Sequence, residues 1–298
     1  MEEAQCWWSG GTTTLKNKLV MIAGATGFIG SHLVAAAPAG YEVLTPSHED
    51  IERGHIPTAH IIIHAAGYGT PSVFMKRPID TIDVNVATTI RLMSYLSLNG
   101  TFLFCSSSEV YRGLTHAANE GEIGTTNPYH SRAAYIEGKR CGETIVNSYR
   151  INGFRAMSAR IGLTYGPHTR KHDARVMNQF IEQALTKHKI ELVDDGQAEV
   201  DYGYGRDTAK MLWNIVLHGT QPVYNVGGVC RVSIKQLAKY IAGKIGAEVV
   251  IPPSPAGFSQ AKMDLSQYFT EFGRPNYTSW DEGLGATIAY QRGLYGIV

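Results

Sequence analysis

Residues Lys18-Leu19-Val20-Met21-Ile22-Ala23-Gly24-Ala25-Thr26-Gly27-Phe28-Ile29-Gly30 decide the fold of this chain. The first six form a short apolar run that ends at a glycine, which is typical of a parallel strand buried on both faces. The next seven have a GxxGxxG spacing, and a helix is expected from about Gly27. Glycines here allow a tight turn and close approach of the backbone to a pyrophosphate, and the helix N-terminus supplies a positive dipole end. The strand, turn and helix together predict a nucleotide-binding turn.

Composition places the chain among globular proteins. Its 298 residues are 44% apolar, which is enough for one large domain or two modest ones with a substantial core. Lys and Arg number 27 against 26 Asp and Glu, so the formal charge is +1. This balance gives no support for a nucleic-acid-binding stripe or for an anionic membrane surface. We therefore expect small-molecule partners, no nucleic acid and no membrane.

The cysteines and the N-terminal segment indicate the compartment. The chain has four scattered cysteines without metal-ligand spacing: Cys6, Cys105, Cys141 and Cys230. Residues 1–17 contain Trp7 and Trp8 but no apolar run long enough for a signal peptide, and no segment approaches a membrane span. We expect a cytoplasmic protein with reduced thiols, no metal site and a loose leader.

Later apolar runs predict the other strands of a parallel sheet, with helices between them. The expected strands cover residues 41–45, 60–64, 101–105 and 223–227. The expected helices cover residues 78–98, 129–150, 175–187 and 202–217. The short stretch between the first two of these strands leaves little room for a full helix. We therefore predict an α/β fold with a doubly wound parallel-sheet Rossmann domain.

The order of these elements predicts two interleaved domains. The helix over 202–217 and the strand over 223–227 return the chain to the main sheet after a polar loop that begins at His168. We expect three parts: a leader at 1–17, a Rossmann domain at 18–166 plus about 201–229, and a smaller interleaved α/β substrate domain at 167–200 plus 230–298.

The helix predicted over 78–98 has apolar residues at near-helical spacing, which indicates a core face. These residues are Ile79, Ile82, Val86, Ile90, Met93 and Leu96. Asn85 interrupts the face, and a buried Asn has to be satisfied by hydrogen bonds. We expect Asn85 to brace the end of a strand near the cofactor.

A candidate acid–base centre lies at Tyr135 and Lys139, which share a helix face because they are four residues apart. A neighbouring ammonium favours the phenolate and so lowers the pKa of a tyrosine from its usual value near 10. Ser107, at the end of the strand over 101–105, is suited to hold the substrate oxygen that Tyr135 deprotonates. The same strand end, where ligands bind in parallel sheets, also carries Ser106, Ser108 and Glu109. A Tyr and a Lys at this spacing are more often a surface pair, but the glycine turn favours a catalytic role.

The end of the second strand bears on the choice of cofactor. NAD-binding versions of this fold carry an acidic residue there, which holds the ribose hydroxyls. That acid is missing, because its place falls near Ser47. Either Asp50 acts as a shifted acid, which favours NAD, or a 2′-phosphate is tolerated, which leaves NADP as the alternative. The turn over 64–67, of sequence HAAG, is expected against the cofactor, with His64 as a packed strand-end residue.

Four motifs resemble a known family. GATGFIG, HAAG, SSSEVY and the Tyr-x-x-x-Lys of RAAYIEGKR, in this order and at these separations, resemble the extended short-chain dehydrogenase/reductases that act on nucleotide-sugars, the NAD-dependent epimerase/dehydratase family. The similarity covers most of residues 18–230. Within the family, RAAYIEGKRCGE, ARIGLTYGP and DARVMNQFIEQAL are similar to UDP-glucuronate decarboxylases. The resemblance implies bound NAD, a nucleotide-sugar substrate and a homodimer in which helices 79–97 and 129–150 pair across the interface.

The resemblance also implies residue roles. Tyr135 is the base, Lys139 contacts the ribose and Tyr135, Ser107 binds the substrate hydroxyl, and Glu109 is an additional acid–base group. The implied cofactor contacts are Gly24, Thr26, Gly27, Phe28, Ile29, Gly30, Ser47, Asp50, Ile51, Ala65, Ala66, Gly67, Asn85, Ser106, Tyr135, Lys139 and Ile161. The implied substrate contacts are Ser107, Ser108, Arg175 and Gln179, of which Arg175 contacts the nucleotide.

The chain departs from the decarboxylase pattern at three polar positions. Leu163 replaces an Asn, His168 an Arg, and Val200 an Arg that binds the diphosphate. Losing a charge-assisted contact to phosphate costs about 1.5–3 kcal/mol. The candidate replacements are Arg206, Arg170 and Lys171. The dehydratases of the family carry an Asp immediately before the Glu, where this chain has Ser108, which weakens the dehydratase interpretation.

The expected chemistry is a transient oxidation. Tyr135 takes the proton from a sugar 4-hydroxyl while the same carbon gives up a hydride to the nicotinamide. The resulting β-keto acid loses carbon dioxide, and the hydride is then returned. The same residues would support a nucleotide-sugar 4-epimerase, a 4,6-dehydratase or a keto-sugar reductase. A rival from another class is a non-catalytic NAD(P)-binding sensor, since fold alone does not establish chemistry. The joint presence of Ser107, Tyr135 and Lys139 favours an enzyme.

Overall fold

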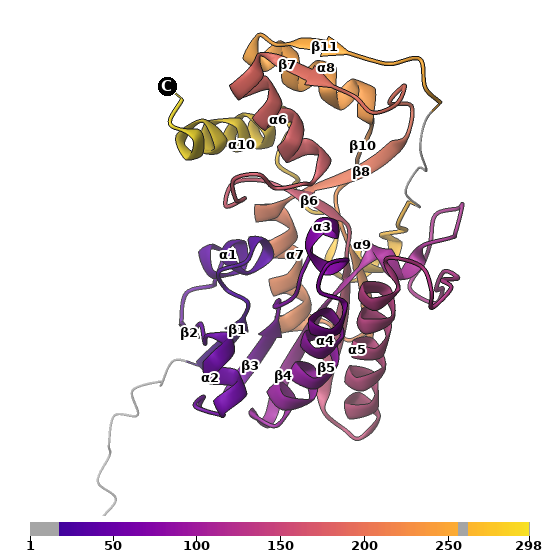
Figure 1. The fold of residues 1–298 in the computed structure, drawn as a ribbon. Helices are drawn as coiled ribbons and strands as arrows, with labels where there is room; N and C mark the ends of the chain where they lie inside the picture. Colours follow the sequence, from indigo (N-terminus) through magenta and orange to yellow (C-terminus); the bar gives the residue numbers. More distant parts are fainter. Residues whose placement is uncertain (1–17, 256–261, 298) are drawn as a thin grey trace, which may run out of the picture.

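A six-stranded parallel sheet forms the centre of the protein in a computed structural model that describes residues 18–255 and 262–297 (Figure 1). The predicted leader at 1–17 lies outside the described residues. The strand order is β2-β1-β3-β4-β5-β9, so the chain winds outward in both directions from β1, and the predicted doubly wound fold is confirmed. The strands are β1 (Lys18–Ala23), β2 (Tyr41–Leu44), β3 (Ala59–His64), β4 (Leu96–Ser107), β5 (Arg155–Ile161) and β9 (Val223–Val226).

Helices cover both faces of this sheet. α1 (Phe28–Ala35) and α7 (Gly205–His218) pack together on one face, and α4 (Pro78–Met93) and α5 (Ala133–Ile151) pack together on the other. Successive strand residues point to opposite faces, so in β1 Val20 and Ile22 enter one core while Met21 and Ala23 enter the other. The short helix α2 (His48–Arg53) joins β2 to β3. Because helices cover both faces of the sheet, strands such as β1 are continuous apolar runs.

The apolar face expected for α4 is not the buried face. Ile79, Ile82 and Ile90 are 74%, 41% and 48% exposed. The residues of α4 that are buried are Thr81, Val84, Asn85, Thr88, Thr89, Leu92 and Met93. The prediction was wrong for these three isoleucines because α4 packs against α5 at Asn85, where a Cβ on Gly138 would lie 3.5 Å from the Asn85 side chain and one on Gly142 would lie 3.0 Å from the Asn85 carbonyl oxygen. Met93, which the prediction also placed on this face, is buried. The helix also ends at Met93, since Leu96 already belongs to β4.

A smaller lobe is built on two short sheets. The three-stranded sheet has the order β10-β8-β6, and β7 pairs with β11. Its strands are β6 (Leu163–Tyr165), β7 (Lys189–Glu191), β8 (Glu199–Tyr204), β10 (Cys230–Ser233) and β11 (Glu248–Val250). The helices α6 (Val176–Lys187), α8 (Ile234–Ile245) and α10 (Trp280–Tyr295) contribute to its core. Three short helices complete the fold: α3 (Pro71–Phe74), the 3-10 helix η1 (Ser108–Tyr111) and α9 (Ser266–Phe272).

The start of the helix predicted over 202–217 is corrected by the structure. Residues 202–204 belong to β8, and α7 begins at Gly205. Tyr202 pairs with Cys230 of β10 and with Leu163 of β6, so this segment is the middle strand of the small sheet. Tertiary pairing overrides the helical pattern here.

A buried polar network ties α5 to the carboxyl ends of β4, β5 and β9. Arg160 of β5 donates to both carboxylate oxygens of Glu143 on α5, with Nη2 to Oε2 at 2.8 Å, and Ser106 Oγ donates to Glu143 Oε1 at 2.5 Å. Arg160 also donates to the Tyr111 hydroxyl at 2.8 Å, and this hydroxyl donates to Asn225 Oδ1 at 2.7 Å. The network holds the helix that carries Tyr135 against the strand end that carries Ser107.

Among residues 18–255 and 262–297, no helix combines the length and the apolar content that crossing a bilayer requires. Cys105, Cys141 and Cys230 are free thiols, and Cys6 lies outside the described residues. The cytoplasmic location stays a prediction.

Arg160→Met should destabilise the protein by about 3–5 kcal/mol, because it leaves the Glu143 carboxylate buried without its partner. Urea unfolding followed by circular dichroism would measure this change in the free energy of unfolding. The double variant Arg160→Met with Glu143→Met should recover part of the loss, since it removes both charges. A double variant no more stable than Arg160→Met would contradict this account.

Candidate active site

Tyr135 and Lys139 lie on the face of α5 that meets the end of β4. The Tyr135 side chain is 9% exposed and hydrogen-bonds Ser107, and its ring stacks on Phe74 of α3 with centroids 4.5 Å apart. Lys139 is 5% exposed, and its ammonium lies 5.8 Å from the centroid of the Tyr135 ring. The structure therefore brings Ser107, Tyr135 and Lys139 together, as the spacing predicts.

The pKa of Tyr135 departs from the expected direction. Burial raises this pKa, and the hydrogen bond from Ser107 opposes the rise. Burial lowers the pKa of Lys139 to about 8, and its ammonium donates to the Cys105 carbonyl at 2.7 Å. The expectation of a lowered pKa for Tyr135 was wrong, because the loss of solvent outweighs the nearby positive charges.

Glu109, at the start of η1, is held by two arginines. Arg132 donates from Nε and Nη2 to the two carboxylate oxygens at 3.1 and 2.9 Å, and Arg112 Nη1 lies 3.6 Å from Oε2. The prediction included Glu109 but missed both arginines. Arg132 could have been found, because it lies three residues before Tyr135 and so next to it on a helix face.

The glycine turn has the shape of a dinucleotide cradle. Gly24 has a φ of +83°, and a Cβ there would lie 2.5 Å from the Ala66 backbone, so the turns at 24–30 and 64–67 are in contact. Gly27 N–H donates to the Gly24 carbonyl at 2.9 Å, and a Cβ on Gly30 would lie 2.0 Å from that same oxygen. No side chain caps the N-terminus of α1, which leaves its first N–H groups open to an anion.

Asn85 of α4 lies against α5, where a Cβ on Gly138 would be 3.5 Å from the Asn85 side chain, and its hydrogen bonding is incomplete. Its Nδ2 donates to the Thr81 carbonyl at 2.7 Å, whereas its Oδ1 is buried without a partner among the described residues. The expectation that Asn85 is fully satisfied by the chain is therefore only half met, and a ligand hydroxyl would complete it. His64 is fully buried and hydrogen-bonds the Val84 carbonyl at 2.9 Å, which confirms its packing role. Burial lowers the pKa of His64 to about 3.

Several predicted cofactor residues are engaged elsewhere. Ser47 and Asp50 form the capping box of α2, in which Asp50 Oδ2 accepts from Ser47 N at 3.0 Å and from Ser47 Oγ at 2.6 Å. Ile51 is buried in the core under α2, so its side chain stabilises that core and does not face the cradle. Ile161 is the register partner of Ser107 across β4 and β5. Of the described acids that follow β2, Asp50 is thus part of this capping box and Glu49 is paired with Arg53 at 2.7 Å.

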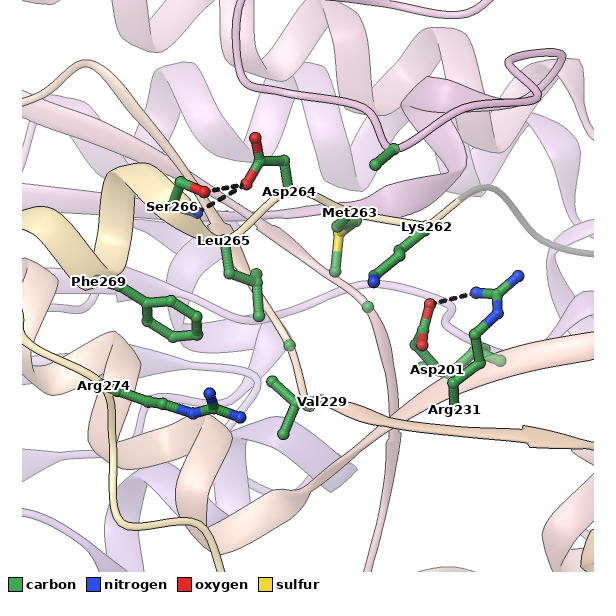
Figure 2. A pocket seen from close by; sticks show the side chains of 15 residues that line it. Asp201, Val229, Arg231, Lys262, Met263, Asp264, Leu265, Ser266, Phe269 and Arg274 are labelled. Carbon is green, nitrogen blue, oxygen red and sulfur yellow. Dashed lines mark hydrogen bonds and ion pairs between the residues drawn. The ribbon is translucent and has the colours of Figure 1, made fainter.

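A cavity of about 550 Å³ opens at the carboxyl ends of β5 and β9 (Figure 2). Its floor includes Gly162, which directly follows Ile161, and Gly227, which follows β9. A Cβ on either glycine would lie within 2.8 Å of the terminal methyl of Met263, so Met263 fills the space that the glycines leave. Gly162 is one residue beyond Ile161, the register partner of Ser107, but Ser107, Tyr135 and Lys139 do not line the cavity.

The walls of the cavity carry charge. Arg231 is paired with Glu199 and Asp201 at 2.8 and 2.7 Å. Lys262 and Arg274 enter from opposite sides, and neither forms an ion pair with another described residue. Lys262 nevertheless acts on the carboxylates of Asp201 and Asp264 in the same lining, whereas the Arg274 guanidinium lies over the Phe269 ring at 5.9 Å. Arg274 is therefore the cation of the wall that is best suited to an anionic ligand.

The predicted substrate residues occupy different places. Arg175 caps the start of α6, is paired with Asp173, and its guanidinium lies 4.7 Å from the Phe28 ring of the cradle. Gln179 is exposed on α6 and does not line the cavity. Ser108 is buried beside Ser107. The structure therefore places Arg175 next to the cradle, and none of the four predicted substrate residues lines the cavity.

Val200 stands where the decarboxylases have a diphosphate-binding arginine, and two candidate replacements for that arginine contact other side chains. Arg206 is paired with Glu282 at 2.8 Å, and the Lys171 ammonium lies 5.4 Å from the Tyr295 ring. Arg170 is exposed. No described group of three or more His, Cys, Asp or Glu side chains is arranged to hold a metal ion.

A model of the NAD dependent epimerase/dehydratase family matches residues 20–227. The chain belongs to this family. The match spans the cradle, the Tyr135 centre and β9, and NAD is the cofactor of the family. The geometry of Gly24, Gly30 and the uncapped N-terminus of α1 fits a dinucleotide.

Curated relatives within this family extend over most of the chain. UDP-glucuronic acid decarboxylase 1 of Arabidopsis thaliana is 29% identical over 303 residues, which is 92% of this chain and 70% of the relative. UDP-glucuronic acid decarboxylase 1 of Xenopus tropicalis is 28% identical over 305 residues, which is 92% of this chain and 72% of the relative.

Solved structures share the fold. An epimerase of Methanothermobacter thermautotrophicus superposes with a TM-score of 0.82 at 18% identity, covering 95% of this chain and 94% of that one. UDP-glucuronic acid 4-epimerase of Bacillus cereus superposes with a TM-score of 0.77 at 21% identity, covering 93% and 100%. These matches agree with the doubly wound sheet described above.

Gly24→Ala should weaken NAD binding by about tenfold or more, because an Ala at a φ of +83° is strained and its Cβ meets the Ala66 backbone. Isothermal titration calorimetry with NAD would measure the affinity. Gly40→Ala is the matched control, since Gly40 has a φ of +87° but no atom within 4 Å of its Cβ. Equal loss of NAD affinity in both variants would contradict the cradle.

Proposed function

We propose that this family member modifies a nucleotide-sugar by oxidising its 4-hydroxyl, as an enzyme similar to the UDP-glucuronate decarboxylases. The observation that carries the proposal is the buried Tyr135 phenol, which hydrogen-bonds Ser107 beside the Lys139 ammonium. The decarboxylases that align with 92% of this chain support the substrate class.

In this proposal each residue acts on the sugar at a stated atom. Ser107 Oγ holds the 4-oxygen, and the Tyr135 phenolate removes its proton. Bound NAD supplies the acceptor for the hydride of the same carbon. Lys139, held by the Cys105 carbonyl, keeps a positive charge near the phenolate. Asn85 and Lys139 would hold the cofactor ribose.

Oxidation at carbon 4 of a uronic acid places a ketone β to the carboxylate. Such a β-keto acid loses carbon dioxide readily, because the electron pair left on carbon 5 is delocalised into the ketone. The protein's contribution is orientation and electrostatics, since the substrate provides its own electron sink.

The cavity at the carboxyl ends of β5 and β9 supports an anionic, nucleotide-sized substrate. Its volume of about 550 Å³ is in the range of small-molecule sites. Lys262 and Arg274 offer cationic contacts to a diphosphate where Val200 offers none.

Epimerisation at carbon 4 is the second candidate. Leu163 and Val200 pack against the apolar core of the small lobe, so the polar pattern of the decarboxylases is incomplete at both positions. Both reactions begin with oxidation of the 4-hydroxyl, so Ser107, Tyr135 and Lys139 serve epimerisation equally well.

Tyr135→Phe should lower turnover by about 10²–10⁴-fold while NAD affinity stays near wild type, because the variant lacks only the hydroxyl. The assay incubates the protein with a panel of nucleotide-sugars and weighs the products. Loss of carbon dioxide indicates a decarboxylase, unchanged mass with altered retention an epimerase, and loss of water a dehydratase. Tyr129→Phe, at an exposed tyrosine, is the control. A Tyr135→Phe variant with the wild-type rate would exclude Tyr135 as the base.

We also propose a homodimer formed through α4 and α5. Ile79, Ile82 and Ile90 form an exposed apolar stripe along α4, spaced at three and eight residues, with the partly buried Val86 between them. An exposed stripe of this kind on a helix is suited to pack against a second helix pair.

Ile82→Asp with Ile90→Asp should convert the dimer to a monomer, because a carboxylate buried without a partner opposes association. Light scattering coupled to gel filtration would measure the mass. Val193→Asp, at an exposed apolar residue of the small lobe, is the control and should leave the mass unchanged. Unchanged dimers in the double variant would place the interface elsewhere.

A further inference from the structure

An arginine, a phenylalanine and the tyrosine of the acid–base centre lie in contact. The ring of Phe74 lies nearly parallel to that of Tyr135, at an interplanar angle of 12°. The Arg132 guanidinium carbon lies 5.2 Å from the centroid of the Phe74 ring. Phe74 of α3 therefore covers one face of the Tyr135 ring, and the Arg132 guanidinium lies over the Phe74 ring.

Arg132 makes a second contact in the same place. Its Nε and Nη2 donate to separate oxygens of Glu109, a fork that fits a carboxylate and fixes its plane. The side chains of Arg132 and Glu109 are 22% and 19% exposed, so water screens this pair only in part. Arg132 therefore links the position of Glu109 to the position of the Phe74 ring.

Charged and polar groups approach Tyr135 from each element packed against it. β4 contributes Ser107 and Cys105, η1 contributes Glu109, and α5 contributes Arg132 and Lys139, whose ammonium lies 5.8 Å from the ring. α3 contributes the uncharged Phe74 ring. The opposite charges of Glu109 and Arg132 act on Tyr135 in opposite directions.

We propose that Arg132 is a positioning residue of the Tyr135 centre, which holds Glu109 as a proton acceptor and compensates its negative charge beside the phenol. The inference rests on the proposed function in one respect, that Tyr135 is the base. It goes beyond the proposed function because it assigns a role to Arg132, which does not contact the reacting sugar in that function.

The pair of Arg132 and Glu109 helps to distinguish dehydration from the other candidate reactions. A carboxylate with both oxygens bound to one guanidinium accepts protons and has none to donate. Elimination of water needs a proton donor for the departing hydroxyl, and Ser108 stands where the dehydratases carry an Asp. The Arg132–Glu109 pair therefore favours decarboxylation or epimerisation over dehydration.

The effect on Tyr135 has a definite sign. Glu109 raises the pKa of Tyr135 and Arg132 lowers it. Arg132→Met leaves Glu109 with only the longer of its two described arginine contacts, to Arg112 at 3.6 Å, so its negative charge is less compensated and the phenol should ionise at a higher pH. Glu109→Gln should move the ionisation to lower pH. The double variant should return close to the wild-type midpoint.

The experiment titrates the NAD-saturated protein that carries ¹³C-labelled tyrosine, by NMR. The Tyr135 resonance is identified by its absence in Tyr135→Phe, and its chemical shift reports ionisation of the phenol. Opposite shifts in the two single variants, with recovery in the double variant, support the proposal. An unchanged or lower midpoint in Arg132→Met, or no recovery in the double variant, would overturn it.

Two further variants separate positioning from general structural damage. Arg140→Met removes another arginine of α5, which hydrogen-bonds the Val110 and Gly124 carbonyls, and it should leave the midpoint of Tyr135 unchanged. Arg132→Lys retains the charge but not the fork, so it should restore the midpoint. A shift in Arg140→Met equal to that in Arg132→Met would overturn the proposal.

The titration needs no substrate, so its outcome is independent of turnover. Suppose that no nucleotide-sugar reacts, while the midpoint of Tyr135 shifts in the two single variants and recovers in the double variant. The proposed function then fails, and the coupling of Arg132 to Tyr135 stands. A product that has lost water from the wild-type enzyme would overturn the role of Glu109 as an acceptor.

Discussion

The ion pair between Glu143 and Arg160 is the interaction on which the rest of the site depends. It joins α5 to β5, and through Ser106 and Tyr111 it reaches the end of β4 and the start of η1. Glu143 lies one helical turn after Lys139, so the pair fixes the segment of α5 that faces the cradle. A buried ion pair contributes little net stability, because desolvation offsets its attraction. Its value here is geometric, since its hydrogen bonds allow only one placement of the helix on the sheet.

Burial sets the chemistry of the centre that this placement creates. Removal of solvent disfavours a charge on either group, so it raises the pKa of Tyr135 and lowers that of Lys139 to about 8. Burial therefore places the pKa of Tyr135 above that of Lys139, which is the reverse of their order in water. Charges around them then decide where the proton resides, which is why the pair of Arg132 and Glu109 matters. Perturbed titrations that stand beside a cofactor cradle are typical of a catalytic centre.

Sequence patterns were reliable where one local constraint dominates. Strands buried on both faces are continuous apolar runs, so β1 and β3 agree with the prediction to within one residue, whereas β4 begins at Leu96, five residues before the predicted start at Thr101. The stripe of Ile79, Ile82 and Ile90 on α4 was assigned to the core, because periodicity shows which residues share a face but not what covers that face. Residues 202–204 were assigned to a helix although they form the middle strand of the small sheet, whose partners are distant in the chain.

The sequence by itself determined the class of fold, the cradle at Gly24–Gly30 and the shared face of Tyr135 and Lys139, because each follows from spacing within a single strand, turn or helix. Only the tertiary structure decided the partners of these residues. Arg132 on Glu109, Phe74 on Tyr135, and the cavity between Gly162 and Lys262 join segments that lie far apart or on different elements. The physical reason is that charge compensation and burial depend on distances through space, and these are set when the sheet, the helices and the small lobe pack together.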